Sequence, residues 1–385
     1  MIVRCFAALV TVLFLANSAG VATAADPLEI PAILPVTGPA AFLGRSFSET
    51  LKLVEDRTNK AGGINGRPIH FAIQDDQSTP QVAVQLTNGA LAKNPPLIIN
   101  GGPLALCAAA VALVKNGPLM WCLSPSLRVE AGSYAFGVMS SSHDFIQAGM
   151  TYFKNRGFKR IAVLNGTDAT GADGDEILAD LIKLPEYAGM SYVDYEHFNL
   201  ADLSVGAQIS RIKASGAQAL IAYTTGAPIA TVLHGLVDAG LDIPVFSSNG
   251  NMSTVQLDGY KSFVPKELLF GAYPAFDADP VADGAVKQKI ADFRSDCKGA
   301  GFSPDLLHAI PWDAAFLIVD AFRHLGPNAT AAQLRDSVAG VTNWAGLMGR
   351  YDFRAIPNRG IGLKAVIVLK WDPVHSGFVG VGKGS

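Results

Sequence analysis

The sequence has few cysteines, and their positions argue against metal and redox motifs. Cys5 belongs to the apolar N-terminal stretch, which leaves Cys107, Cys122 and Cys297 for the rest of the chain. These three show neither C-x-x-C spacing nor a nearby histidine cluster, so we predict no metal ion and no cofactor. In an oxidising compartment Cys107 and Cys122 can form a disulfide, but both can equally be buried as small apolar side chains.

The motifs of common enzymes and nucleic-acid-binding proteins are also missing. The chain has no G-x-S-x-G, no H-E-x-x-H, no P-loop and no G-x-G-x-x-G after its first apolar strand. Its formal net charge is −3, and it contains no run of Lys or Arg that could follow a phosphate backbone. We therefore predict that the protein is not an enzyme and does not bind nucleic acid.

The sequence also lacks an apolar segment long enough to span a membrane, since the apolar segment at the N-terminus is short. Arg4 precedes an apolar run at residues 6–16, and small residues follow at 19–25, with Ala22-Thr23-Ala24 matching an A-x-A cleavage site. A membrane span needs about 20 apolar residues. This pattern predicts a cleaved secretory signal peptide over residues 1–25 and a periplasmic location. No cysteine stands at the cleavage point, which argues against a lipid anchor.

After the leader, short apolar strands alternate with amphipathic helices. Strands are predicted at residues 28–35, 69–73, 97–100, 119–123, 160–164, 219–223, 244–246 and 364–371. Helices are predicted at residues 47–59, from 80 onward, after 103, and at 174–184, 204–215, 226–239, 281–294 and 311–324. Such alternation is typical of parallel sheets covered on both faces. It occurs before and again after about residue 145, so we predict an α/β chain with two Rossmann-like lobes.

Polar or small residues follow most of the predicted strands. They form the loops at 37–38, 101–103, 124–126, 165–168, 224–226 and 247–250. Ligands of open parallel sheets bind just beyond the carboxyl ends of the strands. Two such sheets that face each other would therefore hold a ligand in the cleft between them.

Four stretches, taken in order, resemble a known family. They are residues 34–39 with Leu43-Gly44, residues 59–67 with the following strand that ends in Asp75-Asp76, residues 124–126, and residues 168–171. Together they resemble the leucine/isoleucine/valine-binding proteins, the type I periplasmic solute-binding proteins of ABC importers. The resemblance covers essentially the whole chain after the leader. It implies a monomer that captures a small molecule by hinge closure and delivers it to ABC permease subunits.

The family's fold also implies lobe boundaries. Two Rossmann-like lobes would be joined by three crossovers near residues 141–146, 273–278 and 356–362. Lobe 1 would then comprise residues 26–144 plus 275–361, and lobe 2 residues 145–274 plus 362–385.

The resemblance places the ligand-binding residues position by position. They are Leu43, Leu104, Ala105, Ser126 and Leu127 in lobe 1, Thr170, Thr225, Gly226 and Asn249 in lobe 2, and His308. The chain departs from amino-acid binders at Pro103-Leu104, where those proteins present Ser. It departs again at Thr170, where they commonly place an aromatic residue, and at Asn249, where they place the Glu that neutralises the ligand's ammonium group.

The departure at Asn249 predicts the ligand class. An amide brings no charge, and burying an ammonium group without a counter-charge is expensive. We therefore expect a small carboxylate without an amino group, such as an aromatic acid, an aryl keto acid or a hydroxy acid, and His308 could donate to its carboxylate or phenol. A branched-chain amino-acid receptor and a ligand sensor for a membrane receptor remain alternatives.

Three of these positions also have a purely structural interpretation. Ser126 can cap a following helix, Asn249 can stabilise its own turn, and His308 can be a satisfied histidine at the rim of the pocket.

Overall fold

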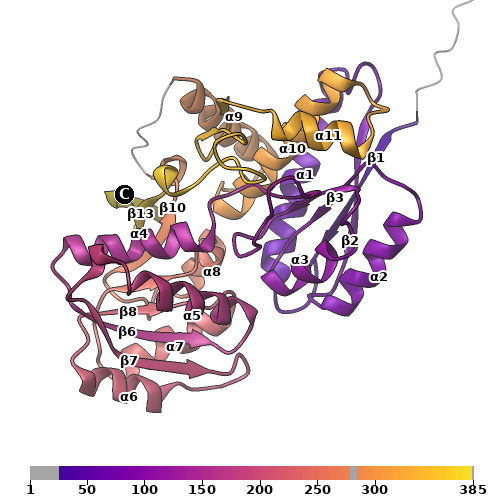
Figure 1. Cartoon of the computed structure of the whole chain (residues 1–385). Coiled ribbons are helices and arrows are strands. Elements are labelled where there is room, and N and C mark those ends of the chain that lie inside the picture. Colours follow the sequence, from indigo (N-terminus) through magenta and orange to yellow (C-terminus); the bar gives the residue numbers. More distant parts are fainter. Residues whose placement is uncertain (1–25, 278–283, 384–385) are drawn as a thin grey trace, which may run out of the picture.

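The computed structural model describes residues 26–277 and 284–383, which form two lobes side by side (Figure 1). The predicted signal peptide at residues 1–25 lies outside the described residues. In the described ranges, no helix combines the length and the apolar character that a membrane crossing requires.

Lobe 1 is built around a five-stranded parallel sheet. Its strands are β1 (Leu28–Leu34), β2 (Ile69–Asp75), β3 (Leu97–Asn100), β4 (Leu119–Cys122) and β5 (Ala135–Gly137), in the order β2-β1-β3-β4-β5. The first helices are α1 (Ala41–Lys60), α2 (Pro80–Leu91) and α3 (Leu104–Val111). Because the chain order reverses at β1, the loops after β1 and β3 leave the sheet side by side at its carboxyl edge.

Lobe 2 is built around a seven-stranded sheet in the order β14-β13-β10-β9-β8-β6-β7. Its strands are β6 (Arg160–Gly166), β7 (Ser191–Phe198), β8 (Ala219–Ala222), β9 (Val245–Ser247), β10 (Leu268–Ala272), β13 (Ile367–Asp372) and β14 (Gly377–Lys383). Its helices are α4 (Ser142–Asn155), α5 (Ala169–Leu181), α6 (Gly206–Ser215), α7 (Pro228–Asp238) and α8 (Thr254–Gly259). Strands β6 to β10 pair in parallel, whereas β13 and β14 pair antiparallel at one edge.

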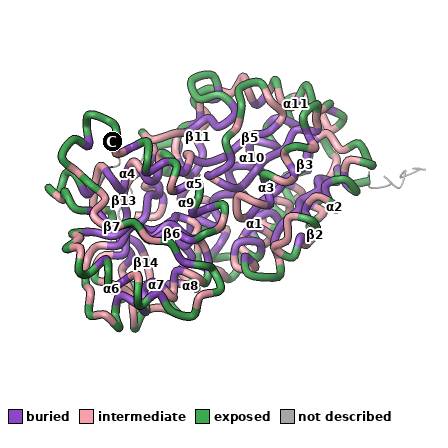
Figure 2. The backbone as a smooth tube through the Cα atoms, turned by 60° about the horizontal axis from the view of Figure 1, so that its bottom comes forward, coloured by how far each residue is buried: buried purple, intermediate pink, exposed green. Residues whose placement is uncertain are grey.

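The segment between β10 and β13 returns to lobe 1. Helices α9 (Gly284–Ala300), α10 (Leu306–Leu325) and α11 (Ala331–Ala339) lie beside lobe 1, and α10 packs against α1 (Figure 1). The short elements are β11 (Trp344–Ala345), β12 (Arg350–Tyr351), η1 (Pro185–Tyr187), η2 (Asn249–Asn251), η3 (Pro274–Phe276) and η4 (Leu363–Ala365). The central strands of both sheets and most of α10 are buried, whereas the edge strands β2 and β7 are partly exposed (Figure 2).

The predicted α/β class with two parallel-sheet lobes is confirmed, while several element bounds differ. Helix α5 begins at Ala169, earlier than the predicted residue 174, because the Asp168 side chain accepts a hydrogen bond from the Gly171 N–H and caps it. Asp305 likewise caps α10, which therefore starts before Pro311. Strands β5, β7, β10 and β14 and helix α4 were not predicted. The predicted lobe boundaries stay a prediction.

Cys107 and Cys122 are joined by a disulfide, which decides between the two interpretations of the sequence. Both residues are fully buried, and Cys297 is a buried free thiol. The bond links α3 to the end of β4, so it fixes the distance between the loops that precede α3 and follow β4.

We expect the disulfide to stabilise lobe 1 considerably. Cross-linking a loop of this size stabilises a protein by about 3 kcal/mol, mainly by restricting the unfolded chain. The double variant Cys107→Ala/Cys122→Ala should therefore lose about 2–4 kcal/mol of unfolding free energy in urea denaturation. The oxidised wild-type protein is the reference, and a double variant of equal stability would contradict the expectation.

Candidate functional site

A pocket lies between the two lobes, and residues of both lobes line it. Lobe 1 contributes the loops at 102–104 and 123–126, Met139, and side chains of α1 and α10. Lobe 2 contributes Thr170, Thr225, Ser248, Asn249 and Gly250. The strand-end loops of both sheets therefore meet here, at the place where open parallel sheets bind their ligands.

The lining of the pocket combines apolar side chains with hydroxyl groups and carries no formal charge. Its apolar wall consists of Leu43, Phe47, Leu104, Leu123, Met139, Leu307 and Ile310. Hydroxyl groups come from Ser124, Ser126, Thr170, Thr225 and Ser248. Among the described lining residues there is no Asp, Glu, Lys, Arg or His. The described part of the chain also contains no group of three or more His, Cys, Asp or Glu arranged to hold a metal ion.

Asn249 is the most exceptional group in the pocket. Its side chain is buried, with only 2% of the residue exposed, and neither its amide oxygen nor its amide nitrogen makes a hydrogen bond. A buried polar group without a partner costs about 1–3 kcal/mol. The neighbouring Asn251 is fully satisfied, since it accepts from the Gly226 N–H at 2.7 Å and donates to the Thr224 carbonyl at 2.7 Å. Asn251 therefore stabilises the turn, and the Asn249 amide is left free in the pocket.

Ser126 lines the pocket and contacts lobe 2 through Ser142. Its hydroxyl lies 2.7 Å from the hydroxyl of Ser142 at the start of α4. It does not cap that helix, because Ser141 and Asp144 form the capping box there. The Ser126 hydroxyl therefore lies at the pocket and does not cap a helix.

Two glycines allow helices to approach the strand-end loops closely enough to present pocket residues. A Cβ atom on Gly44 would lie 2.2 Å from the Pro35 carbonyl oxygen, and one on Gly171 would lie 1.8 Å from the Gly166 carbonyl oxygen. Any larger residue would push α1 or α5 away from its sheet. Gly44 thus places the adjacent Leu43, and Gly171 places the adjacent Thr170.

Six of the ten predicted site residues line this one pocket, namely Leu43, Leu104, Ser126, Thr170, Thr225 and Asn249. Ala105 follows Leu104 in α3 but does not line the pocket. The Leu127 carbonyl accepts a hydrogen bond from Arg359, and Gly226 faces the Phe42 ring across the cleft. Whether any of these residues contacts a ligand stays a prediction.

Sequence reasoning missed three lining residues that lie on helices, namely Phe47, Leu307 and Ile310. Phe47 is four residues after the predicted Leu43 on α1, and Leu307 and Ile310 are three apart on α10. Such spacings put both side chains of a pair on one helix face. The spacing could have indicated a shared face, but it could not distinguish a face in the core from one at a pocket.

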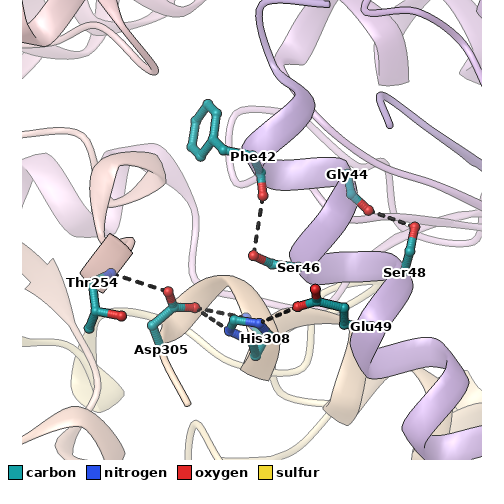
Figure 3. A network of polar contacts seen from close by, with 8 residues as sticks. All are labelled: Phe42, Gly44, Ser46, Ser48, Glu49, Thr254, Asp305 and His308. Carbon is teal, nitrogen blue, oxygen red and sulfur yellow. Dashed lines mark hydrogen bonds and ion pairs between the residues drawn. The ribbon is translucent and has the colours of Figure 1, made fainter. Parts of the chain in front are cut away.

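The structure does not place His308 in the pocket; it lies in an adjacent crevice between the lobes (Figure 3). Its Nδ1 is 2.6 Å from Asp305 Oδ1 and its Nε2 is 3.1 Å from Glu49 Oε2. Asp305 also accepts a hydrogen bond from the Thr254 N–H of lobe 2 at 3.3 Å. The second interpretation, a satisfied rim histidine, therefore describes the geometry of His308.

The environment of His308 favours its charged form. Burial lowers the pKa of the imidazole, but the hydrogen bonds and charges of Asp305 and Glu49 outweigh burial, so its pKa is raised above the ordinary 6.5. The stability that His308 contributes is thus fully present below pH 6.5 and is lost as the pH rises through the raised pKa.

We expect this loss to be visible in the unfolding free energy of His308→Gln relative to wild type. The advantage of the wild type should shrink with rising pH, by about 1.4 kcal/mol for each unit by which the folded-state pKa is raised. Denaturant unfolding over a pH series measures it. His375→Gln is the control, since His375 pairs with Asp372 but is 79% exposed. A difference for His308→Gln that stays constant with pH would contradict the expectation.

Comparison with known proteins identifies the class. The family model described as a periplasmic binding protein matches residues 27–376. The chain belongs to this family of periplasmic solute-binding proteins, the receptors of ABC transporters, and it is a receptor rather than an enzyme. The resemblance to leucine/isoleucine/valine-binding proteins is confirmed.

Two curated relatives illustrate the likeness in sequence. The chain is 26% identical over 284 residues to the leucine-, isoleucine-, valine-, threonine- and alanine-binding protein of Pseudomonas aeruginosa, covering 72% of this chain and 74% of the relative. It is 25% identical over 306 residues to Leu/Ile/Val-binding protein homolog 1 of Brucella abortus, covering 77% and 78%.

Solved structures share the fold at low sequence identity. An extracellular ligand-binding receptor from Rhodopseudomonas palustris superposes with a TM-score of 0.81 at 19% identity, over 92% of this chain and 99% of that one. A branched-chain amino acid transporter substrate-binding protein from Streptococcus pneumoniae in complex with isoleucine gives 0.76 at 17%, over 93% and 100%. A solute-binding protein from R. palustris in complex with benzoate gives 0.76 at 17%, over 93% and 96%.

Proposed function

We propose that this receptor binds a small organic carboxylate that has no amino group, and delivers it as a monomer to the permease of an ABC importer. Aromatic acids, aryl keto acids and hydroxy acids are the candidates. The observation that carries the proposal is the Asn249 amide, buried at the pocket with both polar atoms unpartnered. A ligand group that accepts from the amide nitrogen, or donates to its oxygen, would remove that cost.

The charge of the pocket supports the acid over the amino acid. An amino acid brings an ammonium group, which loses its hydration when the lobes close and needs a carboxylate in exchange. The described lining residues contain none. A carboxylate needs only donors, and the hydroxyls of Ser124, Ser126 and Thr225 can supply them.

The apolar wall supports a ligand with an apolar body. Leu104, Met139, Leu307 and Ile310 line the pocket together with its hydroxyl groups. Burying apolar ligand surface gains about 25 cal/mol per Å². A ligand whose ring or short alkyl chain packs against these apolar side chains, and whose carboxylate accepts from the hydroxyls, would contact both kinds of lining residue. Among the fold relatives, the benzoate complex is an example of a two-lobed receptor holding such a molecule.

Closure of the hinge would complete the site. In the open form the loops of both lobes face water, and closure brings Thr170, Thr225 and Asn249 of lobe 2 onto the lobe 1 loops. A ligand shifts this equilibrium by its differential affinity for the closed form. The permease would then recognise the closed shape.

The proposal is tested by a thermal-shift screen with two panels. One panel holds benzoate, 4-hydroxybenzoate, phenylpyruvate and lactate, and the other holds leucine, isoleucine and valine. A ligand at 100 times its Kd stabilises the folded state by about 2.7 kcal/mol. We expect shifts with members of the acid panel. Shifts with the amino acids alone would contradict the proposal and favour a branched-chain amino-acid receptor.

Substitutions of Asn249 test the site itself. Asn249→Ala removes the free amide and should weaken binding of the selected acid about tenfold, as expected for one hydrogen bond to a charged group. Asn249→Glu adds a carboxylate and should weaken acid binding further by repulsion. Titration calorimetry measures both affinities. Asn88→Ala, at an exposed position of α2, is the matched control. Unchanged affinity in both Asn249 variants would exclude Asn249 from the site.

A further inference from the structure

The two strand-end loops that lobe 2 contributes to the ligand pocket are joined to each other by side-chain hydrogen bonds. The fully buried Asn251 side chain accepts a hydrogen bond from the Gly226 N–H and donates one to the Thr224 carbonyl, both at 2.7 Å. It also donates to the Ser247 hydroxyl at 3.1 Å. These bonds connect the loop after β8 to the turn after β9, so the pocket residues on the two loops hold fixed positions relative to each other.

Asn249 lies in this turn with a fixed backbone and an unpaired side chain. Its carbonyl accepts a hydrogen bond from the Met252 N–H at 3.0 Å. The hydroxyl groups of Thr225 and Ser248 lie 2.9 Å apart, so one donates to the other. The Asn249 side chain, by contrast, lines the pocket with neither its amide oxygen nor its amide nitrogen hydrogen-bonded. The turn therefore presents a hydrogen-bond donor and an acceptor side by side, both buried and both without a protein partner.

A carboxylate alone matches only one half of this amide. An amide oxygen accepts hydrogen bonds and an amide nitrogen donates them, whereas an ionised carboxylate only accepts. A simple acid such as benzoate would therefore pair with Nδ2 of Asn249 and leave Oδ1 buried without a donor, which is unfavourable. An α-keto acid has the same deficiency, because its keto oxygen is a second acceptor.

An α-hydroxy acid matches both halves of the amide. Its carboxylate can accept from Nδ2 of Asn249 while the hydroxyl on the adjacent carbon donates to Oδ1. An α-ammonium group would occupy the position of that hydroxyl and could also donate to Oδ1, but its charge would be buried against a neutral amide. The described lining residues of the pocket include no Asp or Glu, and Glu49 and Asp305 line the adjacent crevice instead. A neutral hydroxyl is thus the donor that suits this position.

The remaining lining residues fit the other parts of such a ligand. The hydroxyls of Ser124 and Ser126 can donate to the carboxylate oxygen that Asn249 does not contact. Leu104, Met139 and Leu307 offer apolar surface to the side chain of the acid. Because burial of apolar surface is favourable, an aromatic or branched alkyl side chain gains more from this lining than the methyl group of lactate.

We propose that the ligand is an α-hydroxy acid with an apolar side chain, whose hydroxyl donates to Oδ1 of Asn249 while its carboxylate accepts from Nδ2. The inference rests on the proposed function and narrows its candidates to one class. Asn249 is then the residue that distinguishes the hydroxy acid from the amino acid, the keto acid and the deoxy acid of the same carbon skeleton.

The test compares ligands that share a carbon skeleton and differ only at the α carbon. One series is phenyllactate, phenylpyruvate, 3-phenylpropionate and phenylalanine, and the other is 2-hydroxy-4-methylpentanoate, 4-methyl-2-oxopentanoate, 4-methylpentanoate and leucine. Titration calorimetry of the wild-type protein measures each affinity, with both enantiomers of each hydroxy acid. Because the apolar side chain is constant within a series, the ratio of affinities reports the α substituent. In at least one series we expect the better enantiomer of the hydroxy acid to bind about tenfold more tightly than the keto and deoxy acids, as for one added hydrogen bond.

The possible failures of this inference and of the proposed function are distinguishable. Hydroxy acids that bind no more tightly than the deoxy acids, or that do not bind, would overturn the α-hydroxy assignment. The proposed function would still stand if any acid without an amino group binds. Binding of phenylalanine or leucine alone would instead overturn the proposed function itself.

Variants of Asn249 test whether the preference comes from this amide. In Asn249→Ala the affinity ratio of hydroxy acid to deoxy acid should fall to about one, because the hydroxyl loses its acceptor. In Asn249→Asp a carboxylate replaces the amide, so the ratio of hydroxy acid to amino acid should shift about tenfold or more toward the amino acid. Asn88→Ala, at an exposed position of α2, should keep both wild-type ratios.

Each ratio is taken within one folded variant, so a general loss of affinity cancels. A wild-type ratio of hydroxy acid to deoxy acid in Asn249→Ala would overturn the inference. An unchanged ratio of hydroxy acid to amino acid in Asn249→Asp would overturn it as well, so either variant suffices if the other does not fold.

Discussion

The structure depends on one constraint, which is that its ligand pocket is assembled from two separate sheets. The strand-end loops of the lobes meet there, and Ser126, Thr225 and Asn249 line the space between them. Under the proposed function, closure of the lobes would remove water from these three residues together. Buried polar groups without partners cost about 1–3 kcal/mol each. Closure is therefore most favourable with a molecule that supplies the missing partners, so ligand selection and lobe closure are one physical event.

The fold was predictable wherever apolar residues form a clear pattern, either a continuous run or a helical spacing. The continuously apolar strands β3, β4 and β8 are buried along their whole length, and the sequence showed each of them. Edge strand β7 escaped prediction because its residues are mostly half-exposed and carry charge, so no apolar run marks it. Strand β14 escaped because its glycines weaken the pattern. The antiparallel pairing of β13 with β10 is tertiary and has no local signal.

The site was predictable where it consists of strand-end loops, because the fold brings all such loops to one place. That reasoning reached Ser126, Thr225 and Asn249. The side chain of His308 lies outside the pocket, because it turns toward Asp305, which caps its helix, and toward Glu49. Whether His308 contacts a ligand stays a prediction. The same reasoning could not reach Asp173, because a residue of α5 comes to line a crevice with Ser126 only through the approach of the other lobe.

Charge and ligand recognition are spatially separated in this receptor. The described pocket lining is neutral, whereas charged contacts between the lobes lie outside it, with Arg128 and Glu176 on one side and Asp305 with the Thr254 N–H on the other. Exposed ion pairs contribute only about 0–1 kcal/mol and weaken with salt. They therefore contribute little to holding the lobes together. Under the proposed function, the larger contribution would come from a ligand that supplies partners to the buried polar groups of the pocket, and closure would then depend on occupancy.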